Sequence, residues 1–380
     1  MNLKGTQRCD FRDSKSKPHH LKYRGSSEIK SQKSHSRSRP SKPSYAFELE
    51  GYYSGKFGQI VTPIALLKTL AVISSTFETN NKLWILNVAP SRHLKTQTTQ
   101  EQTLIFPKNR LVYVGSDFTI HGIIRDYDSG RKLDKKCMLI NDTTLLLASK
   151  AKQTKSRLID AFSELASEGR YIYRDFQQTY EVKARFSLIA NITPHSFLVN
   201  RSELLGNTFI ERCLVVYHAL TDEEMSDANL NRENRASPKI ERFRQTLRES
   251  DVSVTAEDKV RFDEYSKRWR IFGAYSSSSS VFDMIKSVAI AYAILNNHRK
   301  ITKDEYRFLD MLEPYLRNPD ESVKLQILEL ARQGRSINDI CLMLNQETKK
   351  YRSFVSRTIS EYRRKGILPW IKQITPVELT

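Results

Sequence analysis

The segment from Ala89 to Thr96 has the residue types and the spacing of a phosphate-binding loop. It reads Ala-Pro-Ser-Arg-His-Leu-Lys-Thr and follows the short apolar run Leu83–Val88. In the pattern G-x-x-x-x-G-K-[ST], backbone N–H groups and a helix N-terminus surround phosphate groups, the lysine neutralises them, and the hydroxyl ligates Mg²⁺. The segment therefore predicts a nucleotide-binding site formed by Ala89, Pro90, Ser91, Arg92, His93, Leu94, Lys95, Thr96 and Gln97.

This loop departs from the pattern at both glycine positions, which are occupied by Ala89 and Leu94. Leu94 brings a Cβ to a point where the backbone must approach the ligand closely. An ordinary strand-loop-helix connection is the alternative interpretation. A loop that binds a nucleotide weakly, or that only maintains the fold, also stays open.

A carboxylate follows a second apolar run. Asp142 comes after Cys137–Ile140 and Asn141, which is a Walker B-like pattern. In that pattern the carboxylate holds Mg²⁺ beside the loop hydroxyl, so Thr96 and Asp142 are the predicted metal ligands. The alternative is an acidic residue at the end of a buried strand without a metal.

Two more residues fit roles in phosphate chemistry. Asn191 lies near the end of the run Phe186–Thr193, where a polar side chain can orient an attacking water. Arg212 directly precedes the run Cys213–Tyr217, where an arginine finger would reach the γ-phosphate of a neighbouring subunit. The order of these residues on successive runs carries more weight than either residue alone.

The elements that must position these residues form an alternating series. A helix is expected from Thr62-Pro63 to Phe77, with Thr62 as its N-cap, and an amphipathic helix near Lys155–Glu168. Strands are expected at 83–88, 110–114, 136–144, 186–193 and 213–217. Largely continuous apolar strands that alternate with helices predict an α/β fold, with a parallel sheet covered by helices on both faces.

The stretch Lys82–Glu224 resembles a family of P-loop ATPases found on phages, plasmids and other mobile elements, distantly similar to AAA+ and minichromosome-maintenance helicase modules. The matching pieces are Asp117–Thr119, Leu139–Leu147, Ile189–Pro194 and Phe209–Arg212. The resemblance implies a P-loop NTPase sheet that binds ATP and Mg²⁺. It also implies a homo-oligomer, because a finger that acts in trans requires a neighbouring subunit.

The chain departs from this family directly after Asp142. Most relatives of the AAA+ kind have a catalytic glutamate there, and this chain has Thr143. By analogy with the recombinase-like branch, Asp117 at the end of the second strand is the candidate general base. Hydrolysis of ATP, as opposed to its binding, is therefore left open.

Composition divides the chain and points to a polyanionic partner. Residues 1–44 carry twelve Lys or Arg and three acids, so we expect a disordered basic arm. Residues 45–224 form the expected ATPase-like core, and 225–312 a linker and a helical lid. The net charge of +19 indicates nucleic acid or another polyanion. With no signal-peptide core and no long uninterrupted apolar run, a cytoplasmic protein without membrane contact is expected.

Residues 313–380 have the pattern of an all-α helix-turn-helix domain. Ser336 is expected to cap a short helix, Gln346–Lys365 to form a long basic helix, and Gly366–Trp370 to begin a wing. The first half of the basic helix predicts DNA contacts by Lys349, Lys350, Arg352, Ser353 and Arg357. A protein-docking module with a solvated basic face is the alternative.

Three classes of function are compatible with these features. The first is a DNA-associated ATPase, helicase-like or a maintenance factor of a mobile element. The second is a non-enzymatic DNA-binding initiator or regulator in which the nucleotide site is degenerate. The third is a protein-interaction scaffold whose basic helix docks an acidic partner.

Overall fold

The computed structural model describes most of the chain from Ser44 onward, and the predicted arm lies outside the described residues except for Ser44. The described residues belong to one compact unit. The described residues are 44–79, 82–114, 119–143, 152–197, 200, 204, 209–234, 241–273, 277–316, 327, 330–331, 334–343 and 349–364.

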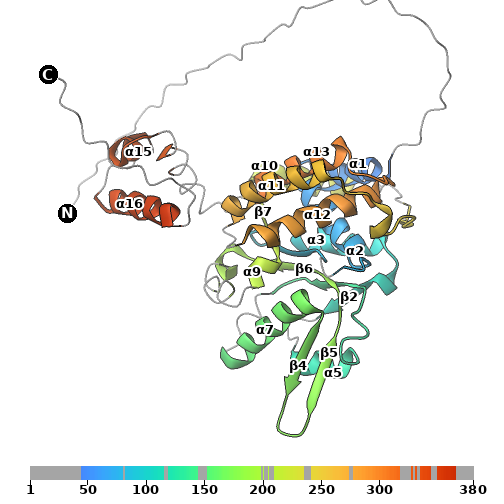
Figure 1. The fold of residues 1–380 in the computed structure, drawn as a ribbon. Coiled ribbons are helices and arrows are strands. Elements are labelled where there is room, and N and C mark those ends of the chain that lie inside the picture. Colours follow the sequence, from blue (N-terminus) through green and yellow to red (C-terminus); the bar gives the residue numbers. More distant parts are fainter. Residues whose placement is uncertain are drawn as a thin grey trace, which may run out of the picture. The chain divides into compact units, whose positions relative to one another are not determined.

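Five parallel strands form the central sheet in the order β2-β3-β6-β1-β7 (Figure 1). The predicted parallel α/β sheet is confirmed. The third strand is shorter than the sequence predicts, because it ends at Ile140 and Asn141 to Thr143 lie outside it. The strands are β1 (Trp84–Val88), β2 (Leu111–Val114), β3 (Cys137–Ile140), β6 (Ser187–Ile192) and β7 (Leu214–Tyr217).

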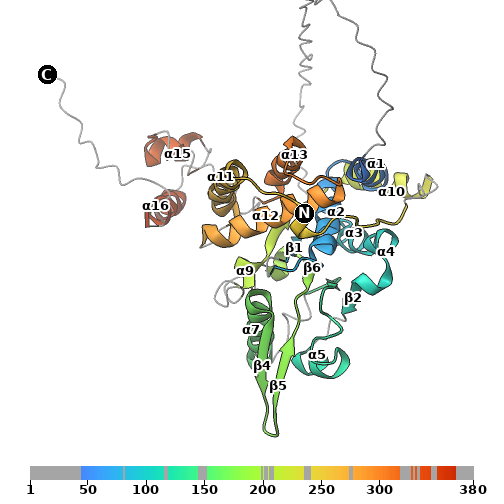
Figure 2. The same cartoon turned by 45° about the vertical axis from the view of Figure 1, so that its right-hand side comes forward.

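One face of the sheet is covered by α2 (Thr62–Ser74), in which all 13 residues are buried. This helix packs on β1 and β6 with one side, and on α1 (Tyr45–Phe57) and α12 (Ser278–Leu295) with the other (Figure 2). Because it has no solvent side, α2 is apolar almost all round. Its single charged residue, Lys68, therefore lies inside the protein.

The opposite face is covered by α7 (Lys152–Glu168) and α9 (Phe209–Arg212). The buried indole of Trp84 on β1 stacks on Phe186 at 5.1 Å and meets the edge of Phe162 on α7 at 5.7 Å. Its Nε1 donates a hydrogen bond to the Phe186 carbonyl at 2.8 Å. Helices on both faces are thus confirmed, and this aromatic cluster joins α7 to the sheet.

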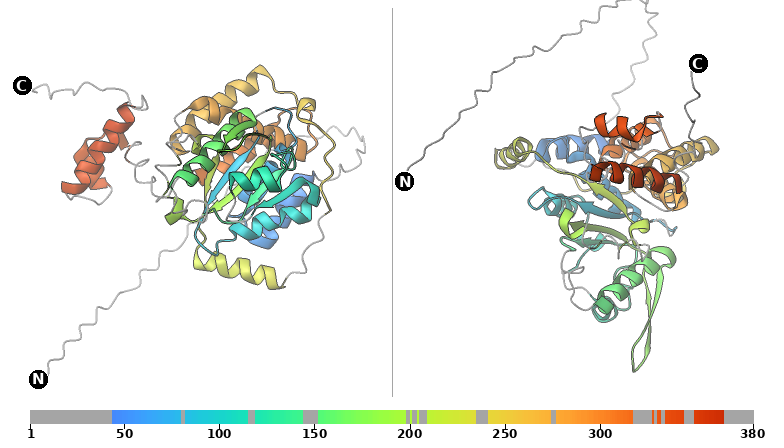
Figure 3. Two further views of the ribbon diagram at one scale, coloured as in Figure 1. Left: turned by 90° about the horizontal axis from the view of Figure 1, so that it is seen from below. Right: turned by 90° about the vertical axis from the view of Figure 1, so that its left-hand side faces the viewer.

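An antiparallel hairpin, β4 (Arg170–Arg174) and β5 (Thr179–Lys183), is inserted between α7 and β6. Figures 1 and 3 show it projecting away from the sheet. No apolar run in the sequence predicts this hairpin, since its strands are short, half-exposed and rich in charge. Its tip carries Phe176, whose side chain is fully exposed.

The remaining elements around the sheet are mostly helical. The segment predicted as a lid contains α12, which packs on α2. Helix α12 is therefore part of the hydrophobic core. Its function as a lid stays a prediction. The elements are α3 (Lys95–Gln100), α4 (Gln102–Ile105), η1 (Lys108–Arg110), α5 (Ile120–Asp126), α10 (Asp222–Asn234), η2 (Glu249–Asp251), α11 (Ala256–Gly273), α13 (Lys303–Leu312) and η3 (Glu313–Leu316).

Helix α12 is, among the described helices, the one long and apolar enough to cross a membrane, with a mean hydropathy of 1.3. Two-thirds of it, 67 %, is buried inside the protein. A helix of this kind also serves as the core helix of a globular body, and α12 fills that place between α2 and α11.

Two C-terminal helices, α15 (Ile337–Met343) and α16 (Lys349–Arg364), pack against each other. The predicted cap of α15 is confirmed, because the Ser336 hydroxyl accepts a hydrogen bond from the Asp339 N–H at 3.1 Å. The predicted wing at Gly366–Trp370 lies outside the described residues, so the winged helix-turn-helix stays a prediction.

Gly130 allows a test of this fold, because it has a φ of +92° and an added Cβ would lie 2.8 Å from the Lys183 carbonyl oxygen. We expect Gly130→Ala to lower the free energy of unfolding by about 2 kcal/mol or more, since left-handed strain and a backbone clash add. The matched control is Gly334→Ala, at φ +76° with nothing within 4 Å, which should cost about 1 kcal/mol. Equal losses in urea denaturation would contradict the close approach of β5 to this turn.

Candidate functional site

The predicted nucleotide residues follow strands that all point the same way, so they share the carboxyl edge of the sheet. After β1 the chain crosses to the edge strand β2, returns through β3 and β6, and then passes to β7 on the other side of β1. In open α/β sheets ligands bind outside the carboxyl ends of the strands, where the strand order reverses. The loop after β1 lies at that point.

The backbone of this loop turns through two left-handed residues, Arg92 at φ 69° and Leu94 at φ 61°. Leu94 is the residue that replaces the second glycine of the pattern, so the backbone bends where the pattern requires a glycine. Its side chain is 5 % exposed and belongs to the hydrophobic core. Ser91 and Arg92 are exposed. The missing glycine is thus accommodated by burying the extra side chain.

Lys95 begins α3 and is nearly buried. Its Nζ donates to the carbonyl oxygens of Ala89 and of Ile192, the latter at 3.2 Å. Burial lowers the pKa of Lys95, and the nearby carboxylate of Asp142 opposes that shift. Asp142 itself is exposed, and Thr96 is half-buried in the first turn of α3. The structure therefore brings Lys95 and Asp142 within electrostatic range at the same edge of the sheet.

A second lysine, which sequence reasoning missed, lies beneath this loop. Lys68 on α2 is completely buried, and four oxygens surround its Nζ: the Lys95 carbonyl at 2.8 Å, Thr98 Oγ1 at 2.8 Å, Thr99 Oγ1 at 3.0 Å and Asn191 Oδ1 at 3.1 Å. Burial, and then the charge of Lys95, hold its pKa well below the usual range. A single lysine within an apolar helix was the available signal.

Asn191 belongs to the same buried network. Its amide also donates to Thr99 Oγ1 at 3.1 Å and accepts from the Asn87 amide at 3.2 Å. Asn191 is fully buried, so in this structure its side chain contacts α2 and α3. Its predicted role in orienting a water stays a prediction.

The network continues to the loop through His218, which follows β7. His218 Nε2 donates to the His93 carbonyl at 2.8 Å, and its Nδ1 lies 3.1 Å from the side-chain amide of Asn87. The His93 ring in turn accepts from the Leu220 N–H at 2.8 Å. Burial lowers the pKa of His218 to about 3, so the ring is neutral at pH 7. Polar side chains therefore connect Lys68 to the loop backbone through β6, β1 and the residue after β7.

The other predicted residues of this group lie elsewhere or outside the described residues. Asp117 is outside them. Arg212 precedes β7 and so lies at the amino edge, separated from Asp142 by the length of a strand, roughly 15 Å. Within one chain the two residues cannot face the same phosphate. Gln97 and Asn141 each have a buried side-chain oxygen without a hydrogen-bond partner in the described part of the chain.

The predicted DNA-binding residues lie on α16, which has two distinct sides. Arg352, Ser353 and Arg357 are exposed, whereas Val355 and Ile359 are buried. The side chains of Lys349 and Lys350 are outside the described set. The helix thus presents basic residues to solvent, an arrangement that suits either phosphate contacts or a solvated surface.

The donor chemistry at the carboxyl edge suits Mg²⁺ and phosphate. Thr96 and Asp142 offer a hydroxyl and a carboxylate, and Mg²⁺ prefers oxygen ligands. The unpartnered oxygen of Asn141 adds a further acceptor nearby. The buried side chain of Leu94 keeps its bulk within the core. Among the described residues no group of three or more His, Cys, Asp or Glu forms a separate metal site.

A scan against protein-family models finds no match for this chain, and a search of the curated proteins finds no relative.

The left-handed loop residues make a stability test possible. Arg92 is exposed at φ 69°, so Arg92→Gly should raise the free energy of unfolding by about 1 kcal/mol, because glycine adopts this conformation without strain. Ser91→Gly, next to it and exposed but without positive φ, should instead lower stability by a few tenths to about 1 kcal/mol. Urea denaturation of both variants measures the difference. Equal losses of stability in both variants would contradict the left-handed conformation of Arg92.

The neutral state of His218 predicts a pH dependence. Its pKa is about 3 in the fold against an ordinary 6.5, so its contribution to stability is fully present above pH 6.5 and is lost as the pH falls toward 3. As the pH falls below 6.5, the free energy of unfolding of the unchanged chain should decrease by about 1 kcal/mol per pH unit more than that of His218→Gln. The control His195→Gln removes an exposed histidine and should keep the original pH dependence. Identical slopes in His218→Gln and the unchanged chain would refute the buried neutral ring.

Proposed function

We propose that this chain binds ATP with Mg²⁺ at the carboxyl edge of its sheet and couples that binding, or hydrolysis, to DNA. The observation that carries the proposal is the loop after β1. It turns through two left-handed residues into α3, and it sets Lys95 within electrostatic range of Asp142. A strand, such a loop and a helix that begins with Lys-Thr form the structural context that the phosphate-binding pattern requires.

Different residues at this edge would bind the phosphates and the Mg²⁺ of a nucleotide. The loop amides would bind the phosphates, and Lys95 would exchange its bonds with the carbonyls of Ala89 and Ile192 for contacts with them. Thr96 and Asp142 would hold Mg²⁺, which neutralises phosphate charge. Below them Lys68 fixes the first turn of α3 through the Lys95 carbonyl at 2.8 Å.

Two surfaces support DNA as the partner. The exposed Arg352 and Arg357 suit phosphate contacts, and the net charge of +19 favours any polyanion. The hairpin tip adds an exposed aromatic side chain, Phe176, next to the exposed Arg174. Aromatic side chains flanked by cations bind unpaired nucleic acid by stacking and charge.

A homo-oligomer is part of the proposal. Because Arg212 and Asp142 lie at opposite edges of one sheet, Arg212 could act on a nucleotide only if it belonged to a neighbouring subunit. The Nε of Arg212 is buried and has no hydrogen-bond partner in the described part of the chain, so such a contact would require its side chain to turn outward.

A non-enzymatic DNA-binding protein is the second candidate. Leu94 stands at the glycine position, Lys95 is bound to loop carbonyls, and Thr143 donates its hydroxyl to the Asn191 carbonyl at 2.9 Å. These features suit a loop that keeps its shape after nucleotide chemistry is lost. In that case DNA binding would not depend on ATP.

The decisive measurement is ATP hydrolysis with and without DNA. Lys95→Ala should reduce turnover on the order of 100-fold, because the charge that stabilises the phosphates is removed. The control Lys303→Ala removes an exposed lysine on α13 and should keep the activity of the unchanged chain.

Direct nucleotide binding separates the two candidates. Calorimetric titration with ATP and Mg²⁺ should give binding to the unchanged chain and none to Lys95→Ala. DNA binding by a chain that binds no nucleotide would favour the second candidate. A chain that binds neither would exclude both.

A further inference from the structure

Every strand of the parallel sheet is preceded by a basic residue. Lys82 comes two positions before β1, Arg110 one before β2, Lys135 two before β3, Arg185 two before β6 and Arg212 two before β7. Because the amino ends of parallel strands share one edge, the fold gathers these cations at the edge opposite to Lys95 and Asp142. Of these five cations, Arg212 alone has a proposed role in nucleotide chemistry, at the site of a neighbouring subunit.

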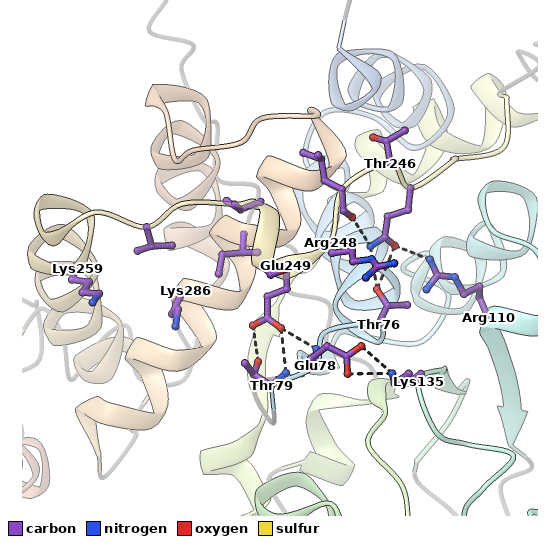
Figure 4. Close-up of a pocket in the computed structure, with 16 residues that line it drawn as sticks. Thr76, Glu78, Thr79, Arg110, Lys135, Thr246, Arg248, Glu249, Lys259 and Lys286 are labelled. Carbon is purple, nitrogen blue, oxygen red and sulfur yellow. Dashed lines mark hydrogen bonds and ion pairs between the residues drawn. The ribbon is translucent and has the colours of Figure 1, made fainter.

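Two adjoining hollows lie along this amino edge, with volumes of about 1040 and 600 Å³. They share Glu78 and Lys135 in their walls, so they form one groove, which we call the amino-edge groove. Figure 4 shows the larger hollow, into which α11, α12 and the linker before α11 contribute side chains. The walls of the groove contain ten Lys or Arg and four acidic residues.

Some of these charges are neutralised within the protein. Lys135 pairs with Glu78 at 2.9 Å, and Lys183 pairs with Glu181 at 2.8 Å. Glu249 accepts hydrogen bonds from the Thr79 hydroxyl at 2.7 Å and from two backbone amides. Lys82 donates to the backbone carbonyls of Ser75 and Phe77 and forms no ion pair with the residues that the structure describes. Five further basic residues of the groove also form no ion pair within the described residues: Arg110, Arg185, Arg248, Lys259 and Lys286.

Arg110 is the most enclosed of these five. Its guanidinium donates to the neutral Gln245 Oε1 at 2.7 Å, and Gln245 is itself held by Thr76 Oγ1 at 3.2 Å and the Leu247 carbonyl at 3.0 Å. Burial lowers the pKa of Arg110, so its charge is partly desolvated without a counter-charge. An anion in the groove would supply that counter-charge and accept its remaining N–H groups.

The lining also limits the kind of anion. Phe77 is its single aromatic residue and is 1 % exposed, so the groove offers no surface on which a base could stack. Its unpaired cations come from α11, α12, the linker and three strand starts, and they are spread along the groove. Such spacing suits a chain of regularly spaced phosphates better than one compact ligand.

We infer that the amino-edge groove binds the phosphate backbone of a nucleic-acid strand, independently of base sequence. The inference shares its DNA partner with the proposed function, but it requires neither the nucleotide site nor α16. It adds a contact surface on the α/β body itself.

The test uses the full chain carrying Arg352→Glu and Arg357→Glu, so that the contribution of α16 is removed. Fluorescence anisotropy with labelled single-stranded and duplex DNA of about 30 nucleotides measures affinity over a range of salt concentrations. Lys259→Glu with Lys286→Glu is added to this chain. The matched control adds Lys303→Glu with Arg307→Glu, two exposed cations of α13 that do not line the groove. Thermal unfolding checks that both variants fold.

We expect the groove variant to bind at least about 10-fold more weakly, with the slope of log affinity against log salt reduced by about 2, and the control to be unchanged. If single-stranded DNA loses more affinity than duplex DNA, the groove holds a single strand. If duplex DNA loses more affinity, the groove holds a duplex. Equal affinities and slopes for the two variants would overturn the inference.

Three other outcomes have separate meanings. If DNA binding depends on Arg352 and Arg357 alone, the groove inference fails while the proposed function stands. If the chain with intact α16 binds no DNA at all, the proposed DNA partner fails as well. Displacement of the labelled DNA by polyglutamate as effectively as by unlabelled DNA of equal charge would indicate an acidic protein segment instead, and would overturn the inference.

Discussion

The carboxyl edge of this protein depends on the burial of one side-chain amine, that of Lys68. A buried polar group without a hydrogen-bond partner costs a few kcal/mol, so a buried lysine must find oxygen atoms. Here α3 supplies the Lys95 carbonyl and two threonine hydroxyls, and β6 supplies Asn191. This requirement fixes the first turn of α3 against the sheet. The positions of Lys95 and Thr96 above it follow from a constraint inside the core.

The polarity of a parallel sheet explains why the two charged regions are separate. Residues that precede strands and residues that follow them are brought to opposite edges, whatever their distance in the sequence. Asp142 thus lies with the loop after β1, while Arg110 and Lys286 lie with the amino-edge groove. One sheet therefore carries the loop after β1 at one edge and a cationic groove at the other, separated by the length of the strands.

Much of the fold was predictable because it rests on local patterns. The five strands followed from continuous apolar runs, and the N-cap of α15 from Ser336. The hairpin was missed because its strands bury little and lack an apolar run. The partners of Lys68 were missed for a different reason, since they come from segments about 27 to 123 residues away that only the fold brings together.

The site shows the same division between local and long-range information. The strand-loop-helix around Lys95 was predictable from eight consecutive residues, whereas the link from Asn191 through Asn87 and His218 to His93 was not. That link is formed by polar side chains at or after the carboxyl ends of three strands. Taken singly, none of these Asn and His residues stands out in the sequence. Proximity across neighbouring strands gives them a common role, and a single sequence carries no signal of it.

The buried side chain of Leu94 restricts which residues can occupy this position. A glycine here would relieve the left-handed backbone but leave a void where the leucine packs, at a cost of about 3 kcal/mol or more. The backbone and the core therefore make opposite demands on one residue, and the core has the larger effect.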